Sequence, residues 1–419
     1  MNILITSLGN KTNLIKYFRR ALFNEGGGRI IGVDCSARNT GKHFVDEFIL
    51  SPHISANGYR AWLYNTIEQQ GVDLIIPSRD GDLLLFSQWK EEIQSLFHCA
   101  VHVSEEPALQ CCLSKTRFSE WCISHGFFTP RIIERAAVTE KDLPLFVKPD
   151  EGSGSEGAQR VASWNHWLGI RDALPPGLLI QPYYDAPEYT VDVYVDGTGA
   201  VRTIVPRQRM LTARGESIHG RVDLNPLIID ATRSLVSEMV FESGLAGHNT
   251  VQCFLYKETV VFIELNPRFG GGFTLGVEAG ADTPRYIVRE ASGLPLEIPD
   301  DYAVDGLQMV RVQKDLFFSE TGPAKVYCFD LDGTLCTESC PYESAKPVPL
   351  IVKKVNALYD RGHTIVISTA RGAASGANWR TLVEAQLSGW GVKYHRLVMD
   401  KPFADYYIDN KSVDILEWI

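Results

Sequence analysis

The run FDLDGTL, from Phe329 to Leu335, constrains the fold of this 419-residue chain more than any other segment. Apolar residues lead into Asp330 and Asp332, which are separated by a single residue. Because side chains alternate along a strand, a strand that ends here projects both carboxylates toward the same side. One carboxylate can then attack a substrate while the other moves a proton. The C-terminal part is therefore predicted to carry a site at a strand end, and the preceding residues need a separate explanation.

Length and charge limit the architecture and the partners of the chain. With a usual domain size of about 150 residues, roughly three domains are expected. The formal net charge is −10 and no long block of lysine and arginine occurs, so neither a nucleic acid nor a membrane surface is an expected partner. No apolar stretch approaches a length of about 18 residues, so no membrane-spanning helix is predicted.

The nine cysteines are scattered and form no C-x-x-C pair. In a chain of this length, that pattern indicates reduced thiols rather than a disulfide framework. The N-terminal segment MNILITSLG has no basic residues followed by a long apolar core, so no secretory signal is predicted. These features lead us to expect a cytoplasmic protein. The oligomeric state stays open, with a homodimer as the commonest form.

Residues 1–105 alternate short apolar runs with helical segments, which is typical of a small α/β domain. The predicted strands are Asn2–Thr6, Arg29–Val33 and Leu74–Pro77, and the predicted helices are Leu14–Leu22 and Tyr59–Gln69. The first turn, Ser7-Leu8-Gly9-Asn10, lacks the full G-x-G-x-x-G pattern. Dinucleotide binding is therefore not predicted.

Residues 106–315 are predicted to form an α+β domain, 316–324 a linker, and 325–419 a second α/β domain. In the α+β domain we predict strands Leu145–Lys148, Leu178–Gln181, Tyr189–Val195 and Thr259–Leu265, and a helix Thr232–Ser243. In the last domain we predict a strand up to Phe329, then helix Val352–Tyr359, strand Thr364–Thr369, helix Asn378–Ser388 and strand Tyr406–Ile408. The fold class is thus multidomain, with α/β and α+β parts.

Polar motifs follow one another in order in residues 325–419. Asp330 and Asp332 end the first strand, Thr369 ends the second, Lys401 follows, and Asp409 comes after the last strand. This ordered set resembles the haloacid dehalogenase-like phosphatases. The gaps between the motifs leave no room for a large cap, so the resemblance implies a small, capless, Rossmann-like domain.

This resemblance implies Mg²⁺-dependent hydrolysis of a phosphomonoester through an aspartyl-phosphate. Asp330 would be the nucleophile and Asp332 the general acid and base. Thr369 would hydrogen-bond the phosphoryl group, and Lys401 would neutralise charge. Asp330, Asp332 and Asp409 would hold Mg²⁺, a hard cation that prefers oxygen ligands. Read without the resemblance, the aspartates could be turn and cap residues, but caps do not explain the ordered lysine and threonine.

The strongest motif in the earlier part of the chain is VVFIELNPRFGGG, Val260–Gly272. An apolar strand there carries Glu264 and Asn266 two residues apart, hence on one face, and Arg268 follows at the same spacing. Gln252, at the end of the preceding apolar segment, can supply a further oxygen. Amide and carboxylate oxygens are suitable ligands for Mg²⁺.

A second motif lies upstream, where Lys148 ends a strand and precedes the loop EGSGSEG, Glu151–Gly157. Backbone N–H groups of such a loop can cradle phosphates, and the lysine supplies a positive charge. The loop, the lysine and the distal Glu-x-Asn motif together predict a phosphate-binding site.

This arrangement, over about residues 1–312, resembles the ATP-grasp superfamily and is closest to its carbamoyl-phosphate synthetase and pyrrolysine-synthesis ligase group. The resemblance implies an ATP-grasp fold that binds ATP and Mg²⁺. The implied ATP-binding residues are Lys115, Lys148, Ser153, Gly154, Ser155, Gly157, Gln181, Tyr183 and Glu188. The implied Mg²⁺ ligands are Gln252, Glu264 and Asn266. Arg207, Arg209 and Arg268 are candidates for stabilising an acyl phosphate, or else Arg207 and Arg209 are solvated surface residues.

Together, the two resemblances imply a bifunctional enzyme. One site would join a carboxylate to an amine through an acyl phosphate, with release of ADP. The other would remove a phosphate from a phosphorylated amine or from the ligated product. One alternative is a single active enzyme, ligase or phosphatase, whose other domain serves as a ligand-binding module. A further alternative is an ATP-grasp carboxylase or phosphotransferase, although the chain has no segment like a biotinyl carrier.

Overall fold

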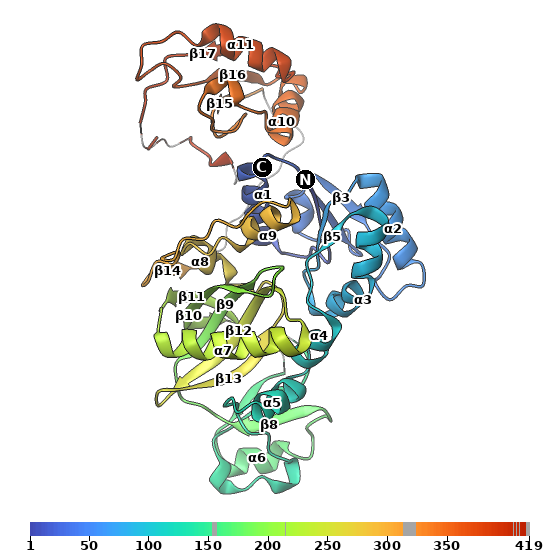
Figure 1. Cartoon of the computed structure of the whole chain (residues 1–419). Helices are drawn as coiled ribbons and strands as arrows, with labels where there is room; N and C mark the ends of the chain where they lie inside the picture. The colour runs from blue at the N-terminus through green and yellow to red at the C-terminus, as the bar shows by residue number, and fades with distance from the viewer. Residues whose placement is uncertain are drawn as a thin grey trace.

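The computed structural model describes residues 1–152, 157–213, 215–312, 324–404, 406–407, 409 and 411–415. Figure 1 shows an elongated molecule in which the C-terminal elements lie at one end and helix α6 (Trp164–Ile170) lies at the other. The predicted phosphate-loop residues Ser153, Gly154 and Ser155 lie outside the described residues, as does most of the predicted linker.

The N-terminal part contains a five-stranded parallel sheet in the order β3-β2-β1-β4-β5. Its strands are β1 (Asn2–Ile5), β2 (Arg29–Asp34), β3 (Glu47–Leu50), β4 (Leu74–Ile76) and β5 (Ala100–Val101), and its helices are α1 (Thr12–Asn24), α2 (Tyr59–Gln70) and α3 (Asp80–Phe97). Ile3 and Ile5 pack with Phe18 of α1, whereas Leu4 packs with Leu63 of α2. Both faces are therefore buried, which explains the short apolar runs in the sequence.

The central part is built on a six-stranded antiparallel sheet in the order β13-β12-β9-β10-β11-β14. Its strands are β9 (Glu188–Val195), β10 (Val201–Ala213), β11 (Glu216–Val222), β12 (Gly247–Tyr256), β13 (Thr259–Asn266) and β14 (Gln308–Val310). Helix α7 (Pro226–Ser243) covers one face, where Leu235 and Met239 pack against Val191 and Phe262. The opposite face of this sheet lies against the N-terminal part, where Tyr194 of β9 packs in the same core as Ile3.

A small antiparallel sheet, in the order β7-β6-β8, lies beside the large one. Its strands are β6 (Leu145–Pro149), β7 (Gln159–Val161) and β8 (Leu178–Pro182). The remaining helices of this part are α4 (Glu106–Cys112), α5 (Lys115–Ser124), α8 (Phe273–Glu278) and α9 (Thr283–Ala291). Short 3₁₀ helices occur at Gly41–His43, Arg135–Ala137, Glu140–Asp142 and Tyr342–Ser344.

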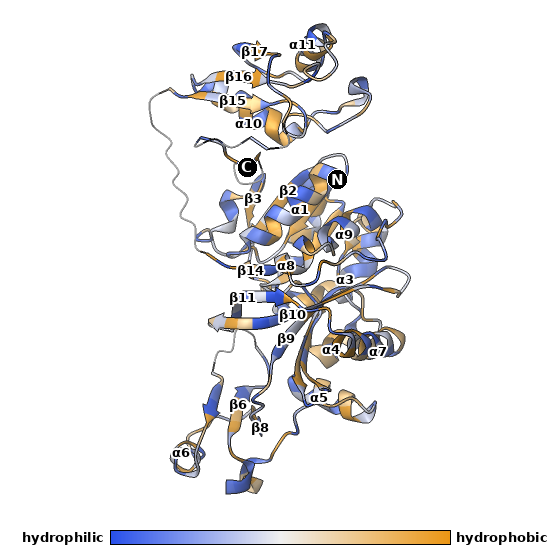
Figure 2. Ribbon diagram, turned by 90° about the vertical axis from the view of Figure 1, so that its left-hand side faces the viewer, coloured by the Kyte–Doolittle hydropathy of each residue, from blue (hydrophilic) through white to orange (hydrophobic). Residues whose placement is uncertain are grey.

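The C-terminal part contains a parallel sheet in the order β15-β16-β17. Its elements are β15 (Val326–Asp330), α10 (Pro349–Asp360), β16 (Thr364–Ser368), α11 (Arg380–Gly389) and β17 (Arg396–Val398). Ile351 of α10 and Ile367 of β16 are fully buried in its core, and Phe23 of α1 packs against the same core. In Figure 2, α1 and α10 are striped with hydrophobic and hydrophilic residues, as expected for helices that bury one face.

Most predicted strands and helices are present, with ends that differ by a few residues, but the predicted strand Tyr406–Ile408 is not. Tyr406 and Tyr407 have no strand pairing, and Ile408 lies outside the described residues. Strands β10, β11 and β14 were not predicted, because polar residues interrupt their apolar pattern. Within the described part of the chain, no helix is long and apolar enough to cross a membrane.

Truncating the C-terminal core should destabilise it selectively. Ile367→Ala removes a fully buried side chain and should lower the free energy of unfolding of this part by about 2–5 kcal/mol. Differential scanning calorimetry should show this transition moving to lower temperature while the main N-terminal transition stays in place. Val326→Ala, at a position 70% exposed on β15, is the control and should change stability by less than about 0.5 kcal/mol. A shift of both transitions by Ile367→Ala would contradict separate cores.

Candidate active site

A cavity of about 530 Å³ lies between the small sheet and the large sheet. Strands of both sheets supply its walls, so side chains distant in sequence meet there. Those predicted for ATP or Mg²⁺ binding that line it are Lys115, Lys148, Gln181, Tyr183, Glu188, Gln252 and Glu264. The structure thus brings together most of the predicted residues. Gly157, the first described residue after 152, has a backbone in the left-handed region, with φ at +74°, which suits glycine.

Two lysines line one side of this first cavity. Burial lowers the pKa of Lys148 to about 8. The Lys115 ammonium donates to the carbonyls of Asp150 and Gly152 and lies 3.7 Å from a carboxylate oxygen of Glu264. Asp150 accepts from the backbone N–H of Thr116, which fixes the start of α5 against the end of β6. The two cationic groups are therefore held beside one another at a site suited to phosphate.

Glu188 of β9 and Arg209 of β10 form an ion pair in the wall that the large sheet supplies. Arg209 donates to Glu188 at 2.7 Å and to the side-chain oxygen of Gln252 at 3.2 Å. Burial raises the pKa of the Glu188 carboxyl above its ordinary value, although the neighbouring Arg209 opposes the shift. Gln181 is buried, and its amide donates to the carbonyl of Pro130. Its side chain is thus engaged within the protein, while Tyr183 borders the cavity.

The predicted Mg²⁺ ligands lie next to one another on β12 and β13. Gln252 is the direct cross-strand partner of Glu264, and the Asn266 amide donates to a Glu264 oxygen at 2.9 Å. Amide and carboxylate oxygens at the edge of a cavity that also carries two lysines match the donors expected for Mg²⁺ bound with a nucleotide. These residues therefore fit the metal that the sequence implies.

A second cavity, of about 390 Å³, adjoins the first and shares Gly215, Gln252 and Glu264 with it. Its other walls come from Lys11 and Arg79, which directly precede α1 and α3, and from the ends of β13 and β14, with Asn266, Arg268 and Arg311. Arg268 donates two hydrogen bonds to Asp80, of 2.5 and 2.8 Å. Burial alone would lower the pKa of Arg268, but the Asp80 carboxylate raises it. Asp80 could not be predicted from a local motif, because its partner lies 188 residues away.

Arg207 does not line either cavity. Its guanidinium donates to both oxygens of Asp192, at 2.6 and 2.8 Å, and the residue is 2% exposed. The structure therefore corrects the prediction that Arg207 acts on an acyl phosphate, because its donors are used inside the protein. It equally corrects the alternative that Arg207 is a solvated surface residue.

The C-terminal residues also converge. Asp330 ends β15, and its carboxylate lies 2.9 Å from the Lys401 ammonium. The Thr369 hydroxyl is buried and donates to Asp332 at 3.5 Å. Asp409 accepts from the backbone N–H of Lys411, and among the described residues no contact joins it to Asp330 or Asp332. The carboxylates at this strand end fit a hard cation, but the structure does not bring Asp409 to them.

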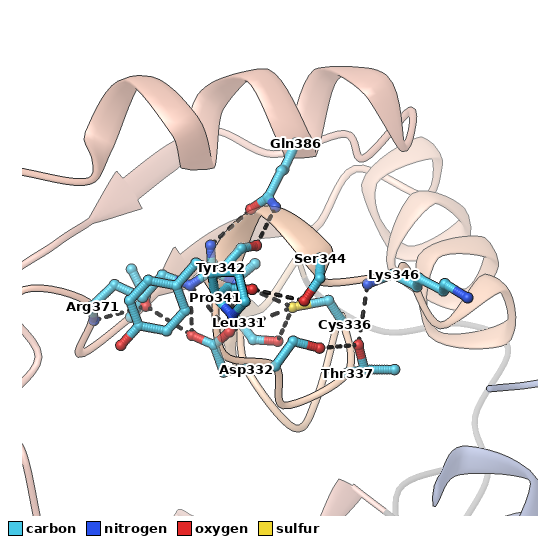
Figure 3. Close-up of polar contacts among 12 residues, drawn as sticks. Leu331, Asp332, Cys336, Thr337, Pro341, Tyr342, Ser344, Lys346, Arg371 and Gln386 are labelled. Carbon is cyan, nitrogen blue, oxygen red and sulfur yellow. Dashed lines mark hydrogen bonds and ion pairs between the residues drawn. The ribbon is translucent and has the colours of Figure 1, made fainter. Parts of the chain in front are cut away.

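Arg371, which lies two residues after Thr369, was not among the predicted site residues. Figure 3 shows its guanidinium beside Asp332 and Tyr342, with Gln386 on the far side. It donates to Asp332 from two nitrogens at 2.5–3.0 Å and to Gln386 at 2.7 Å. An arginine just beyond a strand end that carries a predicted active-site threonine was the available signal. Arg371 and Lys401 both line a cavity of about 280 Å³ at this site.

Removing the buried Arg207 should destabilise the large sheet. Arg207→Met leaves the Asp192 carboxylate buried without a cation and should lower the free energy of unfolding by about 3–5 kcal/mol, measured by urea denaturation. Replacing both residues, as Arg207→Met with Asp192→Leu, should recover much of that loss. Arg171→Met, which breaks an exposed pair with Asp172, is the control and should cost less than about 1 kcal/mol. An equal effect of Arg207→Met and Arg171→Met would contradict this account.

Comparisons with known proteins agree with this architecture. The family model described as "PylC-like, N-terminal domain" matches residues 3–98, and the model described as "ATP-grasp in the biosynthetic pathway with Ter operon" matches residues 175–315. Neither match covers the C-terminal residues 316–419. No curated protein sequence matches the chain.

Solved structures are similar over about seven tenths of the chain. The biotin carboxylase domain of the 2-oxoglutarate carboxylase of Hydrogenobacter thermophilus is 16% identical, with a TM-score of 0.56 over 73% of each chain. The N5-carboxyaminoimidazole synthetase of Staphylococcus aureus, solved with ADP, is 14% identical, with a TM-score of 0.56 over 71% of this chain and 78% of that one. The corresponding ribonucleotide synthetase of Thermus thermophilus is 17% identical, with a TM-score of 0.54 over 71% and 79%. The part of the chain that precedes the C-terminal sheet therefore has an ATP-grasp fold, with an N-terminal domain similar to that of PylC.

Proposed function

We propose that this chain is a bifunctional enzyme, which ligates a carboxylate to an amine at the expense of ATP and hydrolyses a phosphomonoester at a second site. The observation that carries the first activity is the wall shared by the two adjoining cavities, which contains Gln252 and Glu264. ATP in the first cavity would place its terminal phosphate at this wall. A carboxylate in the second cavity would meet it there, so the shared wall supplies the proximity that the reaction needs.

In this proposal the first cavity holds the nucleotide. Lys115 and Lys148 bind its phosphates, and Tyr183 borders the base. Glu188 faces the ribose, although its bond to Arg209 must be shared with any hydroxyl that it binds. Gln252, Glu264 and Asn266 would hold Mg²⁺, which neutralises charge on the transferred phosphoryl group when bound.

The ligation proceeds in two steps. A carboxylate oxygen attacks the terminal phosphorus of ATP, and the bond to ADP breaks, which gives an acyl phosphate. The amine then attacks the carbonyl carbon, loses a proton, and displaces inorganic phosphate to leave an amide. Arg209 borders the first cavity and Arg268 the second, so both cationic groups flank the position where negative charge develops.

Several charges bear on the choice of substrate. The second cavity is lined by four cationic side chains, of which Arg268 and Arg311 are paired with Asp80 and Glu216 in its wall. Lys11 and Arg79 are the cations that would meet an anionic substrate such as a phosphorylated amine. The similar structure from Hydrogenobacter was solved with bicarbonate, so bicarbonate belongs among the acids to be tested. A carboxylation would then replace the amide-forming reaction within the same fold.

The second activity rests on the cluster at the end of β15. Asp330 would attack phosphorus, Asp332 would transfer the proton, and Thr369 and Lys401 would bind the phosphoryl oxygens. Mg²⁺, when held by the carboxylates here, would offset the repulsion between the nucleophile and the phosphate. The parallel order β15-β16-β17 supports the proposal, because Asp330, Thr369 and the segment before Lys401 all lie at carboxyl ends of neighbouring strands.

MgATP binding should take up a proton at alkaline pH. Lys148 has a pKa of about 8 in the free protein, so at pH 8.5 most of it is neutral, and bound phosphates should restore its charge. Isothermal titration calorimetry at pH 8.5 in buffers of different ionisation enthalpy should report an uptake of about 0.8 proton per ATP. Lys148→Arg stays protonated and is the control, which should bind without uptake. Binding by the native protein without proton uptake would show that Lys148 does not contact the phosphates.

The two proposed activities should separate by mutation. Glu264→Ala should abolish ATP-dependent ligation and leave phosphatase turnover unchanged, because Glu264 borders the first two cavities and does not line the cavity that contains Arg371 and Lys401. Asp330→Asn should do the reverse. Glu238→Ala and Asp172→Asn, at exposed positions, are the matched controls and should affect neither activity. Loss of both activities in either folded variant would refute two independent sites.

The substrates can be found with the Asp330→Asn protein, which should retain any phosphorylated product. Acids, including bicarbonate, are crossed with amines and phosphorylated amines in the presence of ATP and Mg²⁺, and ADP release and product mass are recorded. A product equal to acid plus phosphorylated amine minus water would identify the ligation and place the phosphatase after it. Turnover with unphosphorylated amines alone would support the ligase activity and contradict its coupling to the phosphatase.

A further inference from the structure

Arg371 is buried at the C-terminal site, yet the carboxylate that it binds faces the solvent. The side chain of Arg371 is 1% exposed, whereas that of Asp332 is 26% exposed. Two guanidinium nitrogens donate to Asp332, and the third donates to Gln386 (Figure 3). The arginine therefore supports Asp332 from behind and leaves the open side of the carboxylate available.

The surroundings of Arg371 leave its guanidinium little freedom. Its central carbon lies 4.5 Å from the centre of the Tyr342 ring, which stabilises the cation from the face. Gln386 accepts from the guanidinium and donates from its own amide to the carbonyl of Tyr342 at 2.7 Å. The backbone N–H of Arg371 donates to the Thr369 hydroxyl, which in turn donates to Asp332. Asp332 is thus held in one orientation by a closed set of hydrogen bonds.

The position of Arg371 beside the proposed catalytic groups indicates a role beyond stabilising the fold. Arg371 borders the cavity of about 280 Å³ that also contains Lys401, and Lys401 contacts the proposed nucleophile Asp330. The planar, two-pronged contact with Asp332 fixes the direction of the carboxylate as well as its position. A fixed orientation matters most for a carboxylate that must give a proton to one oxygen and later take a proton from another.

We propose that Arg371 is a positioning residue, which holds Asp332 for both of its proton transfers. The inference rests on the proposed phosphatase activity. In the first step Asp330 attacks phosphorus, the bond to the leaving oxygen breaks, and Asp332 gives that oxygen its proton. In the second step water attacks the phosphorus of the aspartyl-phosphate, Asp332 takes the proton from the water, and the bond to Asp330 breaks to release phosphate.

The two steps differ in how strongly they need Asp332. With p-nitrophenyl phosphate the leaving group departs without a proton, so the first step is nearly independent of the acid. Attack by water still requires the base. A misplaced Asp332 should therefore slow only the second step with this substrate, and the phosphorylated enzyme should accumulate. With an alkyl phosphate both steps should slow, and no phosphorylated enzyme should build up.

The test uses the full-length Arg371→Met protein with Mg²⁺ and p-nitrophenyl phosphate. We expect kcat to fall about 10²-fold and KM to fall with it, so that kcat/KM changes little, because only the second step is slowed. We also expect a burst of nitrophenol, and a phosphoryl group on the peptide that contains Asp330 after acid quench. Arg371→Lys keeps the charge but loses the two-pronged contact, and should show a smaller burst. Arg380→Met, on the exposed face of α11, is the matched control and should behave like the native protein.

Each outcome decides the inference. Full activity of Arg371→Met, or lost activity without phosphorylated enzyme while ATP-dependent ligation persists, would overturn the positioning role. If Arg371→Met does not fold, Gln386→Leu removes one support of the guanidinium and should give the same burst at reduced amplitude; its absence counts equally against the role. If the native protein lacks phosphatase activity, or Asp330→Asn retains it, the proposed function itself fails.

Discussion

The ion pair between Arg268 and Asp80 joins the two halves of the ATP-grasp region, and the geometry of the second cavity depends on it. Asp80 begins the helix that follows β4, and Arg268 follows β13. Their two hydrogen bonds hold the carboxyl edge of the parallel sheet against the end of the antiparallel one. The two side chains are partly buried, 15% and 28% exposed, and the two parallel hydrogen bonds fix the direction of the contact as well as its length. The Arg268–Asp80 ion pair thus forms part of the wall of the second cavity and places charged groups there.

The strand that precedes Arg268, β13, also orders the first cavity. Alternation along β13 places Glu264 and Asn266 on one face, and its pairing with β12 sets Gln252 opposite Glu264. Oxygen donors from two strands therefore lie together without any loop to position them. Sites built on paired strands are held more accurately than sites on loops, which suits a reaction that needs close alignment of phosphate and acid.

Much of this arrangement could be predicted from the sequence, because apolar strands and their polar ends are local features. The residues Lys148, Glu264 and Asp330 were each identified from the strand that carries them. What could not be predicted depends on partners remote in sequence. Arg207 resembles Arg209 in the sequence, and only the presence of Asp192 on the neighbouring strand shows that it is internal. Strands β10 and β11 were not predicted because their exposed halves are polar. Asp409 was assigned to the metal site by resemblance, after a predicted strand that the described residues do not form.

Helix α1 has a consequence that follows from its length. Its first residue, Thr12, borders the second cavity, and Phe23 near its other end packs against the core of the C-terminal part. Thirteen residues of helix form a rod of roughly 20 Å. A rod of this kind moves as one piece, so any displacement that a ligand imposes at Thr12 also displaces the surface on which the C-terminal part rests. A ligand in the second cavity and the position of the C-terminal part are thus linked through a single helix.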